Sequence, residues 1–391
     1  MRTAALTGSE LSHTRVRGGR KRRRVAAVGG VALLCATIAS ALLVAPAHAA
    51  GAAGTKTLKV EVVTASDSYL VFRQKRATSA GLLSTKGSTL YAIGRTGGRH
   101  TIPGFDPAYF PDLKGSMLTE SAKPNSRYDT EHPYDPDAPE HVRWRDLRTG
   151  KHGVAELPAG DDYFAAAPGG WLATRTPSSG TTGGATHVVR YTTSGAVTDL
   201  GAPFPAGVPT TDLRRGSAGV LAVSAGNPEE PSEDGVTGAF RYVPYDAPGK
   251  WRDLFTPQPA AKAYCGRPSK THLVCEAYGL RSSHGGSVLI PLAGGKLRWL
   301  DSHRTACQTL VLTAVGRSAF GKATSTGHGC VTGQVVQLTA SGALTTSKRT
   351  YGRHGNVAAG LGGFLLASKD QRSILRLTSA RGTPKVVTTA H

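Results

Sequence analysis

Short apolar segments alternate with polar, glycine-containing turns from residue 58 to the end of the chain. In several segments apolar and polar side chains alternate residue by residue, which is the period of a β-strand with one buried face. No segment sustains the period of a helix. The pattern therefore predicts an all-β protein.

The strands recur in a fixed order, and two of them are distinct in every repeat. The predicted second strands cover residues 68–74, 116–121, 170–176, 219–225, 271–277, 318–324 and 363–369. The predicted third strands cover residues 89–95, 140–147, 186–193, 238–245, 287–293, 334–340 and 373–380. First and fourth strands are less distinct; the clearest are 58–65 and 356–362 among the first, and 196–201 and 384–389 among the fourth.

A glycine-containing turn follows each third strand, and its spacing gives the length of the repeat. The turn glycines are Gly97, Gly150, Gly195, Gly249, Gly295, Gly342 and Gly382. Their mean spacing of about 47 residues is close to the length of a four-stranded propeller blade. The sequence thus predicts a seven-bladed β-propeller of four-stranded antiparallel blades. Both ends of the chain supply a complete unit, so we expect blades that are continuous in sequence, with closure by a strand from the other end as the alternative.

The first 49 residues have the pattern of an export signal. A basic segment up to Arg24 precedes an uncharged, largely apolar run over residues 25–44, and Ala47-His48-Ala49 fits a cleavage site. We expect cleavage near Ala49, a flexible lead over residues 50–57, one propeller domain over residues 58–391, and a secreted, extracellular protein. An uncleaved membrane anchor is the alternative, and both the general and the twin-arginine export routes stay open.

Basic residues exceed acidic ones even without the signal. The chain has 47 Lys and Arg and 26 Asp and Glu, of which eight bases and one acid precede Ala50, so a net charge of +14 remains. Such a surface favours an anionic cell-envelope polymer or a protein as partner. No dense basic block interleaved with aromatic residues follows the signal, which argues against specific nucleic-acid binding. We expect a monomer without a transmembrane segment after cleavage.

Four cysteines follow the signal: Cys265, Cys275, Cys307 and Cys330. An even number in an exported protein predicts disulfides, and four cysteines allow three connectivities. Because Cys265 and Cys275 fall on neighbouring predicted strands of one blade, and the other two on the next blade, we expect sequential pairing. A zinc site is the alternative, although the usual CxxC spacing is absent.

Two connections between second and third strands, residues 121–140 and 225–238, are longer than a turn needs. The first contains Asp129, Glu131, Asp135, Asp137 and Glu140, and the second contains four further acids. Oxygen ligands in a proline-stiffened loop suit calcium, but the spacing of an EF-hand is missing. A solvated acidic loop is the alternative interpretation. Apart from this calcium, the sequence predicts no cofactor.

On these blade patterns, the chain resembles secreted bacterial seven-bladed propellers of the WD-repeat-like or TolB-like kind over about residues 58–389. The diagnostic repeats of true WD, kelch, sialidase-like and quinoprotein propellers are absent, as are the nucleophile elbow, the P-loop and the dinucleotide fingerprint. We therefore expect an exported non-catalytic scaffold that binds a macromolecular or cell-envelope partner and has no catalytic or cofactor-binding residues. The alternative function is a polysaccharide-active hydrolase or lyase that uses carboxylates near the propeller axis.

Overall fold

The computed structural model describes residues 58–76, 88–106, 111–121, 139–176, 184–208, 210–224, 239–255, 262–265, 271–278, 286–294, 298–300, 309–315, 318–323, 331–339, 343–352 and 356–391. The chain divides into two units, Met1–Gly54 and Thr55–His391, and every described residue belongs to the second. The predicted signal and lead lie outside the described residues. No helix among the described residues is long and apolar enough to cross a membrane.

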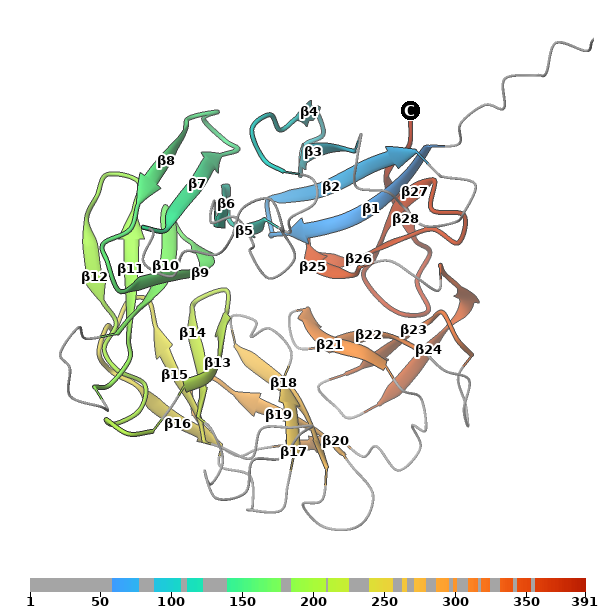
Figure 1. Ribbon diagram of the computed structural model, residues 1–391. Helices are drawn as coiled ribbons and strands as arrows, with labels where there is room; N and C mark the ends of the chain where they lie inside the picture. Colours follow the sequence, from blue (N-terminus) through green and yellow to red (C-terminus); the bar gives the residue numbers. More distant parts are fainter. Residues whose placement is uncertain are drawn as a thin grey trace, which may run out of the picture. The chain divides into compact units, whose positions relative to one another are not determined.

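Seven antiparallel sheets of four strands form the second unit, and each sheet uses four strands that are consecutive in sequence (Figure 1). We number these sheets as blades one to seven. The first strands are β1 (Leu58–Ala65), β5 (Asp112–Lys114), β9 (Asp161–Ala167), β13 (Thr210–Arg215), β17 (Lys262–Cys265), β21 (Thr309–Val315) and β25 (Ala358–Gly360). The second strands are β2 (Tyr69–Arg76), β6 (Met117–Ser121), β10 (Gly170–Arg175), β14 (Gly219–Ser224), β18 (His272–Tyr278), β22 (Ser318–Ala323) and β26 (Gly363–Ala367). The third strands are β3 (Thr89–Gly94), β7 (His141–Asp146), β11 (His187–Thr192), β15 (Phe240–Pro244), β19 (Gly286–Pro291), β23 (Gln334–Leu338) and β27 (Ser373–Leu377). The fourth strands are β4 (Arg99–Thr101), β8 (His152–Glu156), β12 (Val197–Asp199), β16 (Arg252–Phe255), β20 (Arg298–Leu300), β24 (Leu344–Thr350) and β28 (Lys385–Thr389).

First strands contact one another from β1 through β5 and β9 to β13, and from β17 through β21 to β25, and β25 of blade seven contacts β1. This arrangement, with the succession of sheets in Figure 1, is a seven-bladed β-propeller. The predicted fold class is confirmed. The expectation of blades continuous in sequence is also confirmed, because no sheet combines strands from the two ends of the chain.

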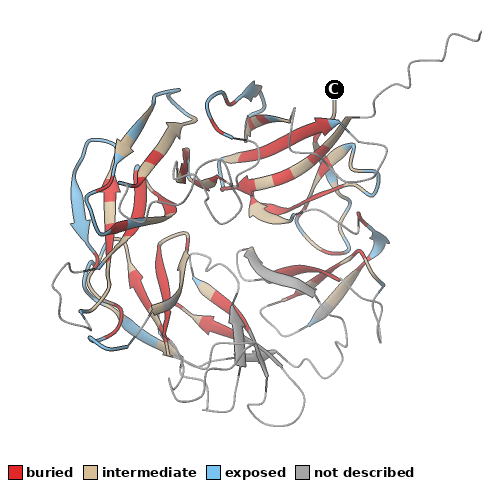
Figure 2. Ribbon diagram, viewed as in Figure 1, coloured by how far each residue is buried: buried red, intermediate tan, exposed pale blue. Residues whose placement is uncertain are grey.

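Burial falls from the second strand to the fourth within a blade (Figure 2). Every residue of β14 and of β26 is buried, whereas every residue of β12 is exposed. The second strand has a neighbouring strand on each side and a neighbouring blade on each face. This position explains why the second strands are rich in consecutive apolar residues.

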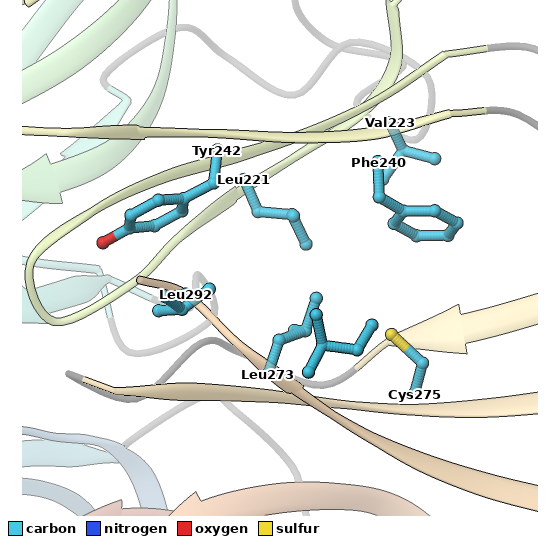
Figure 3. Close-up of a cluster of buried hydrophobic side chains, with 8 residues drawn as sticks. Leu221, Val223, Phe240, Tyr242, Leu273, Cys275 and Leu292 are labelled. Atoms are coloured by element: carbon cyan, nitrogen blue, oxygen red, sulfur yellow. The ribbon is translucent and has the colours of Figure 1, made fainter. Parts of the chain in front are cut away.

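The hydrophobic core is divided among the interfaces between blades. Each of the seven interfaces holds its own cluster of buried apolar side chains. Figure 3 shows the cluster between blades four and five, where Leu221 and Phe240 face Leu273 and Leu292. A single blade would leave such faces exposed to water, so the stability of each blade depends on both of its neighbours.

Blade seven meets blade one through polar as well as apolar contacts. Gln74 Nε2 donates to the His391 carbonyl at 2.7 Å, and Arg99 donates to Gln74 Oε1 at 2.7 Å. The backbone adds bonds from Val60 N to Gln371 O and from Leu361 N to Ser66 O, both 2.8 Å long. We call this set of contacts the closing seam.

Four of the predicted turn glycines have the backbone conformation that the prediction implies. Gly97, Gly150, Gly195 and Gly249 have φ between 75° and 91°, a region that side chains with a Cβ rarely enter. Gly382 has no positive φ, and its amide instead donates to the Ser379 carbonyl at 3.2 Å. Gly295 and Gly342 lie outside the described residues.

Strand direction alternates within each blade, so the connections divide between two edges. The first-to-second and third-to-fourth connections leave one edge, here called the turn end. The second-to-third connections, including the two long acidic ones, leave the opposite edge, here called the loop end. Residues 122–138 and 225–238 themselves lie outside the described residues.

Candidate functional site

The four predicted calcium ligands Asp129, Glu131, Asp135 and Asp137 lie outside the described residues. Glu140, from the same connection, is buried, and both of its carboxylate oxygens accept hydrogen bonds. Oε1 accepts from Ser121 Oγ and Oε2 accepts from the Tyr163 amide, both at 2.6 Å. It therefore joins blades two and three. Within the part of the chain that the structure describes, no three His, Cys, Asp or Glu residues are grouped to hold a metal ion.

Of the four predicted disulfide cysteines, Cys307 and Cys330 lie outside the described residues. Cys265 and Cys275 stand directly opposite each other in the β17–β18 ladder. Cys275 is buried and disulfide-bonded. The sequential pairing stays a prediction.

At the turn end, charged and polar side chains of blades two, three and four lie close together. We call this set the turn-end cluster, and it consists of Asp112, Lys114, Arg190, Arg215, Ser217 and Tyr245. Its members come from first and third strands and from the turns that follow them. The sequence interpretation named none of them.

A bidentate ion pair between Asp112 and Arg215 lies at the centre of the turn-end cluster. Arg215 Nε and Nη2 donate to the two Asp112 carboxylate oxygens at 2.7 and 2.5 Å. The Ala166 amide of β9 donates to Asp112 Oδ2 at 3.0 Å. Only 9% of the Arg215 side chain and 13% of the Asp112 side chain are exposed. Burial alone would lower the pKa of Arg215, yet the charge and hydrogen bonds of Asp112 raise it above its ordinary value, so Arg215 stays charged.

Two further cations of the turn-end cluster donate to backbone carbonyls. Lys114 Nζ donates to Ser217 O at 2.5 Å, which links blade two to blade four. Arg190 Nη2 donates to Pro168 O at 2.6 Å, and its guanidinium carbon lies 5.6 Å from the centre of the Tyr245 ring. With three cations and one carboxylate, the turn-end cluster has a formal charge of +2.

A second group of charges lies where blade one faces blade two. Glu61 Oε2 accepts from Arg73 at 2.9 Å and from Lys75 at 2.7 Å. Burial alone would raise the pKa of Glu61, but the hydrogen bonds and charges of Lys75 and Arg73 hold it below its ordinary value. Glu120 of β6 behaves in the opposite way: burial raises its pKa, although Arg143 donates to it.

The third group is at the loop end of blade three. Arg175 donates through Nε and Nη2 to the two oxygens of buried Asp161, each at 2.9 Å, and Tyr191 also donates to Asp161. Burial and the neighbouring Asp161 raise the pKa of Tyr191 to about 12. The phenol is therefore neutral at physiological pH, and Asp161 accepts hydrogen bonds from both the phenol and the guanidinium.

Three carboxylates on first strands share one property. Glu61, Asp112 and Asp161 each accept hydrogen bonds from a basic side chain. Each of these contacts joins a first strand to another strand of the same blade or of a different blade. The described geometry at these three residues thus supports cross-linking of strands and blades.

Comparison with known proteins supports the fold. No family model matches the sequence, and no curated protein shows significant sequence similarity to it. Solved structures with the same architecture include the β-propeller domain of the Trilobed protease from Pyrococcus furiosus, described as having an open velcro topology. It is 9% identical, with a TM-score of 0.52, and the match covers 85% of this chain and 99% of that domain.

Two larger peptidases contain a similar domain. The acylaminoacyl peptidase of Pyrococcus horikoshii matches at 9% identity and a TM-score of 0.52 over 86% of this chain and 53% of its own. A prolyl endopeptidase matches at 13% identity and a TM-score of 0.54 over 84% of this chain and 48% of its own. This chain thus spans about half the length of these two peptidases. At such identities, the likeness establishes the β-propeller fold alone.

Proposed function

We propose that this chain is an exported, non-catalytic propeller scaffold that binds a protein partner of the cell envelope at its loop end. The observation that carries the proposal is the position of the two long acidic connections. Both leave from equivalent strands, β6 and β14, and return to β7 and β15. Two blades held at fixed positions in one ring thus place their longest connections at the same end.

The charge of these connections favours a protein over an anionic polymer. Residues 121–140 hold five acids and two bases, and residues 225–238 hold four acids and no base. Together they carry −7, while the rest of the chain after residue 49 carries +21. A polyanion would be repelled at the loop end, whereas a basic protein surface would be attracted.

Three carboxylates of the first strands support a binding function further. Glu61, Asp112 and Asp161 lie on first strands, the strands nearest the propeller axis, and all three are engaged by arginine or lysine. A hydrolase or lyase acting near the axis would need carboxylates free to transfer protons or attack the substrate.

A photo-crosslinking experiment tests the proposal in the secreting cell. A photoreactive phenylalanine analogue replaces Tyr134 in the blade-two connection, and the matched control places it at exposed Thr149 in a turn-end connection of the same blade. We expect one protein to crosslink at position 134 and not at position 149. Equal crosslinking at both positions, or crosslinks at position 134 to polysaccharide alone, would contradict the proposal.

A charge variant tests the same contact quantitatively. Changing Asp129, Glu131, Asp135 and Asp137 to Asn or Gln should lower the association rate with the captured protein, and added salt should reduce the difference. Turnover of a polysaccharide by the purified mature chain would replace the scaffold hypothesis with the enzymatic one.

A further inference from the structure

Three buried polar atoms of the turn-end cluster have no hydrogen-bond partner within the described part of the chain. They are Ser217 Oγ, Tyr245 OH and Arg190 Nε. A buried polar group without a partner costs free energy, so most such groups in native proteins are satisfied by protein, water or a ligand. These three atoms therefore indicate a missing partner.

The three atoms lie in one region between blades three and four. The Tyr245 amide donates to the carbonyl of Ala218, the residue after Ser217, at 3.0 Å. The Arg190 guanidinium lies over the Tyr245 ring. The Tyr245 hydroxyl also interacts electrostatically with Arg215, Asp112 and Arg190. Tyr245 thus lies beside Arg190, and its backbone is bonded next to Ser217, so residues from three segments of sequence meet at the same turn end.

The chemistry of these atoms indicates the class of ligand that would bind them. Arg190 Nε can only donate a hydrogen bond, and the hydroxyls of Ser217 and Tyr245 can both donate. Burial raises the pKa of Tyr245, so its hydroxyl keeps the proton that it would donate. Donors in a region with a formal charge of +2 suit a ligand that only accepts hydrogen bonds and carries negative charge.

The residues of the site also reach the surface of the protein. Arg190, Ser217, Tyr245 and Lys114 are each partly exposed as residues, although the unpartnered atoms are buried. The residues are thus partly in contact with solvent, while their three unpartnered polar atoms are desolvated. From these observations we propose that the turn end of blades three and four binds a phosphate group through Arg190, Ser217 and Tyr245, with Lys114 and Arg215 contributing positive charge.

This site is independent of the proposed protein contact. It lies at the turn end, whereas the acidic connections leave the loop end. Neutralising the loop acids should leave phosphate affinity unchanged, so failure of one proposal does not imply failure of the other.

Calorimetric titration of the mature chain with inorganic phosphate, at constant ionic strength set with chloride, tests the site. We expect saturable binding of one phosphate. Tyr245→Phe removes only the hydroxyl, so phosphate affinity should fall about tenfold or more, the effect of losing a hydrogen bond to a charged group. In phosphate-free buffer, the same variant should unfold at an equal or higher temperature, because an unpartnered buried hydroxyl has been removed.

Tyr191→Phe is the matched control. Its hydroxyl is already bonded to Asp161 and Arg175, so this variant should lower the unfolding temperature and leave phosphate affinity unchanged. Ser217→Ala should behave like Tyr245→Phe. A second titration with a soluble polyglycerol phosphate distinguishes the source of the phosphate: binding of both ligands identifies a polymer-bound group, and binding of inorganic phosphate alone identifies the free ion.

Two results would overturn the proposal. One is a wild-type chain that binds phosphate no more tightly than chloride. The other is a Tyr245→Phe variant with unchanged phosphate affinity, which would mean that ordered water alone satisfies the three donors.

Discussion

At the scale of single residues, the Asp112–Arg215 pair shows how charge cross-links this propeller. The two residues belong to blades two and four, and the Ala166 amide of blade three bonds to the same carboxylate. Taking such a pair out of water is costly, and removing one partner leaves the other charge buried without compensation. The pair therefore fixes three first strands relative to one another.

Asp112→Ala should lower the free energy of unfolding by about 3–5 kcal/mol, because Arg215 would stay buried without its anion. Replacing both residues, with Asp112→Leu and Arg215→Met, should recover most of that loss. Urea unfolding monitored by fluorescence measures both effects. A single variant that loses less than about 1 kcal/mol would show that the pair behaves like an exposed surface salt bridge.

The sequence could not indicate this pair. Asp112 and Arg215 are 103 residues apart and carry no recurring spacing, so only the ring brings them together. The same holds for Arg190 and Tyr245, which occupy ordinary strand and turn positions in their own blades. Burial and missing partners, which reveal the phosphate site, are properties of the fold.

At the scale of the strands, the hydrophobic pattern predicted the strand positions well where both faces of a strand are buried. Predicted second strands 170–176 and 219–225 became Gly170–Arg175 and Gly219–Ser224. First strands were harder. The strand β5 has only three residues. The strand β9 begins with the polar pair Asp161-Asp162, and Asp161 accepts hydrogen bonds from Arg175 and Tyr191. Polar residues in those roles break the alternating pattern.

The facing surfaces of β1–β2 and β6–β7 carry two glutamates whose pKa values move in opposite directions, which gives a prediction on pH. Glu61 has a lowered pKa, so its stabilising contribution is present above the ordinary glutamate pKa of about 4.3 and is lost as pH falls below it. Glu120 has a raised pKa, so ionising it costs stability as pH rises above about 4.3.

Unfolding free energies of the wild type, Glu61→Gln and Glu120→Gln between pH 3 and pH 7 test this difference. The stability advantage of the wild type over Glu61→Gln should grow with pH below about 4.3. The stability advantage of the wild type over Glu120→Gln should decrease as pH rises above that value. Parallel curves for the two variants would contradict the assigned directions.

At the scale of the whole molecule, the ring closes at one seam where the first and last described blades meet. Gln74 is the residue of that seam that bonds to both Arg99 and the His391 carbonyl. Gln74→Ala should remove these bonds without disturbing any ladder within a blade. We expect faster amide hydrogen exchange in β1, β27 and β28, with exchange in β10 and β14 unchanged.

Hydrogen exchange followed by mass spectrometry measures this pattern, and Gln337→Ala is a useful comparison. Gln337 accepts from the Ala380 amide at the interface of blades six and seven, so its loss should loosen that interface instead. Uniformly faster exchange in all blades would mean that the ring opens as one cooperative unit and that the seam has no separate role.

Because every blade is built from consecutive strands, the order of events during folding follows from the fold. Each sheet pairs residues that are close in sequence, so its loop-closure cost is small and its strands can associate as soon as they are available. The contact between Gln74 and His391 spans 317 residues and can form only when the last blade is present. Ring closure is then a docking of two finished sheets, and no terminal strand has to be inserted between others already in place.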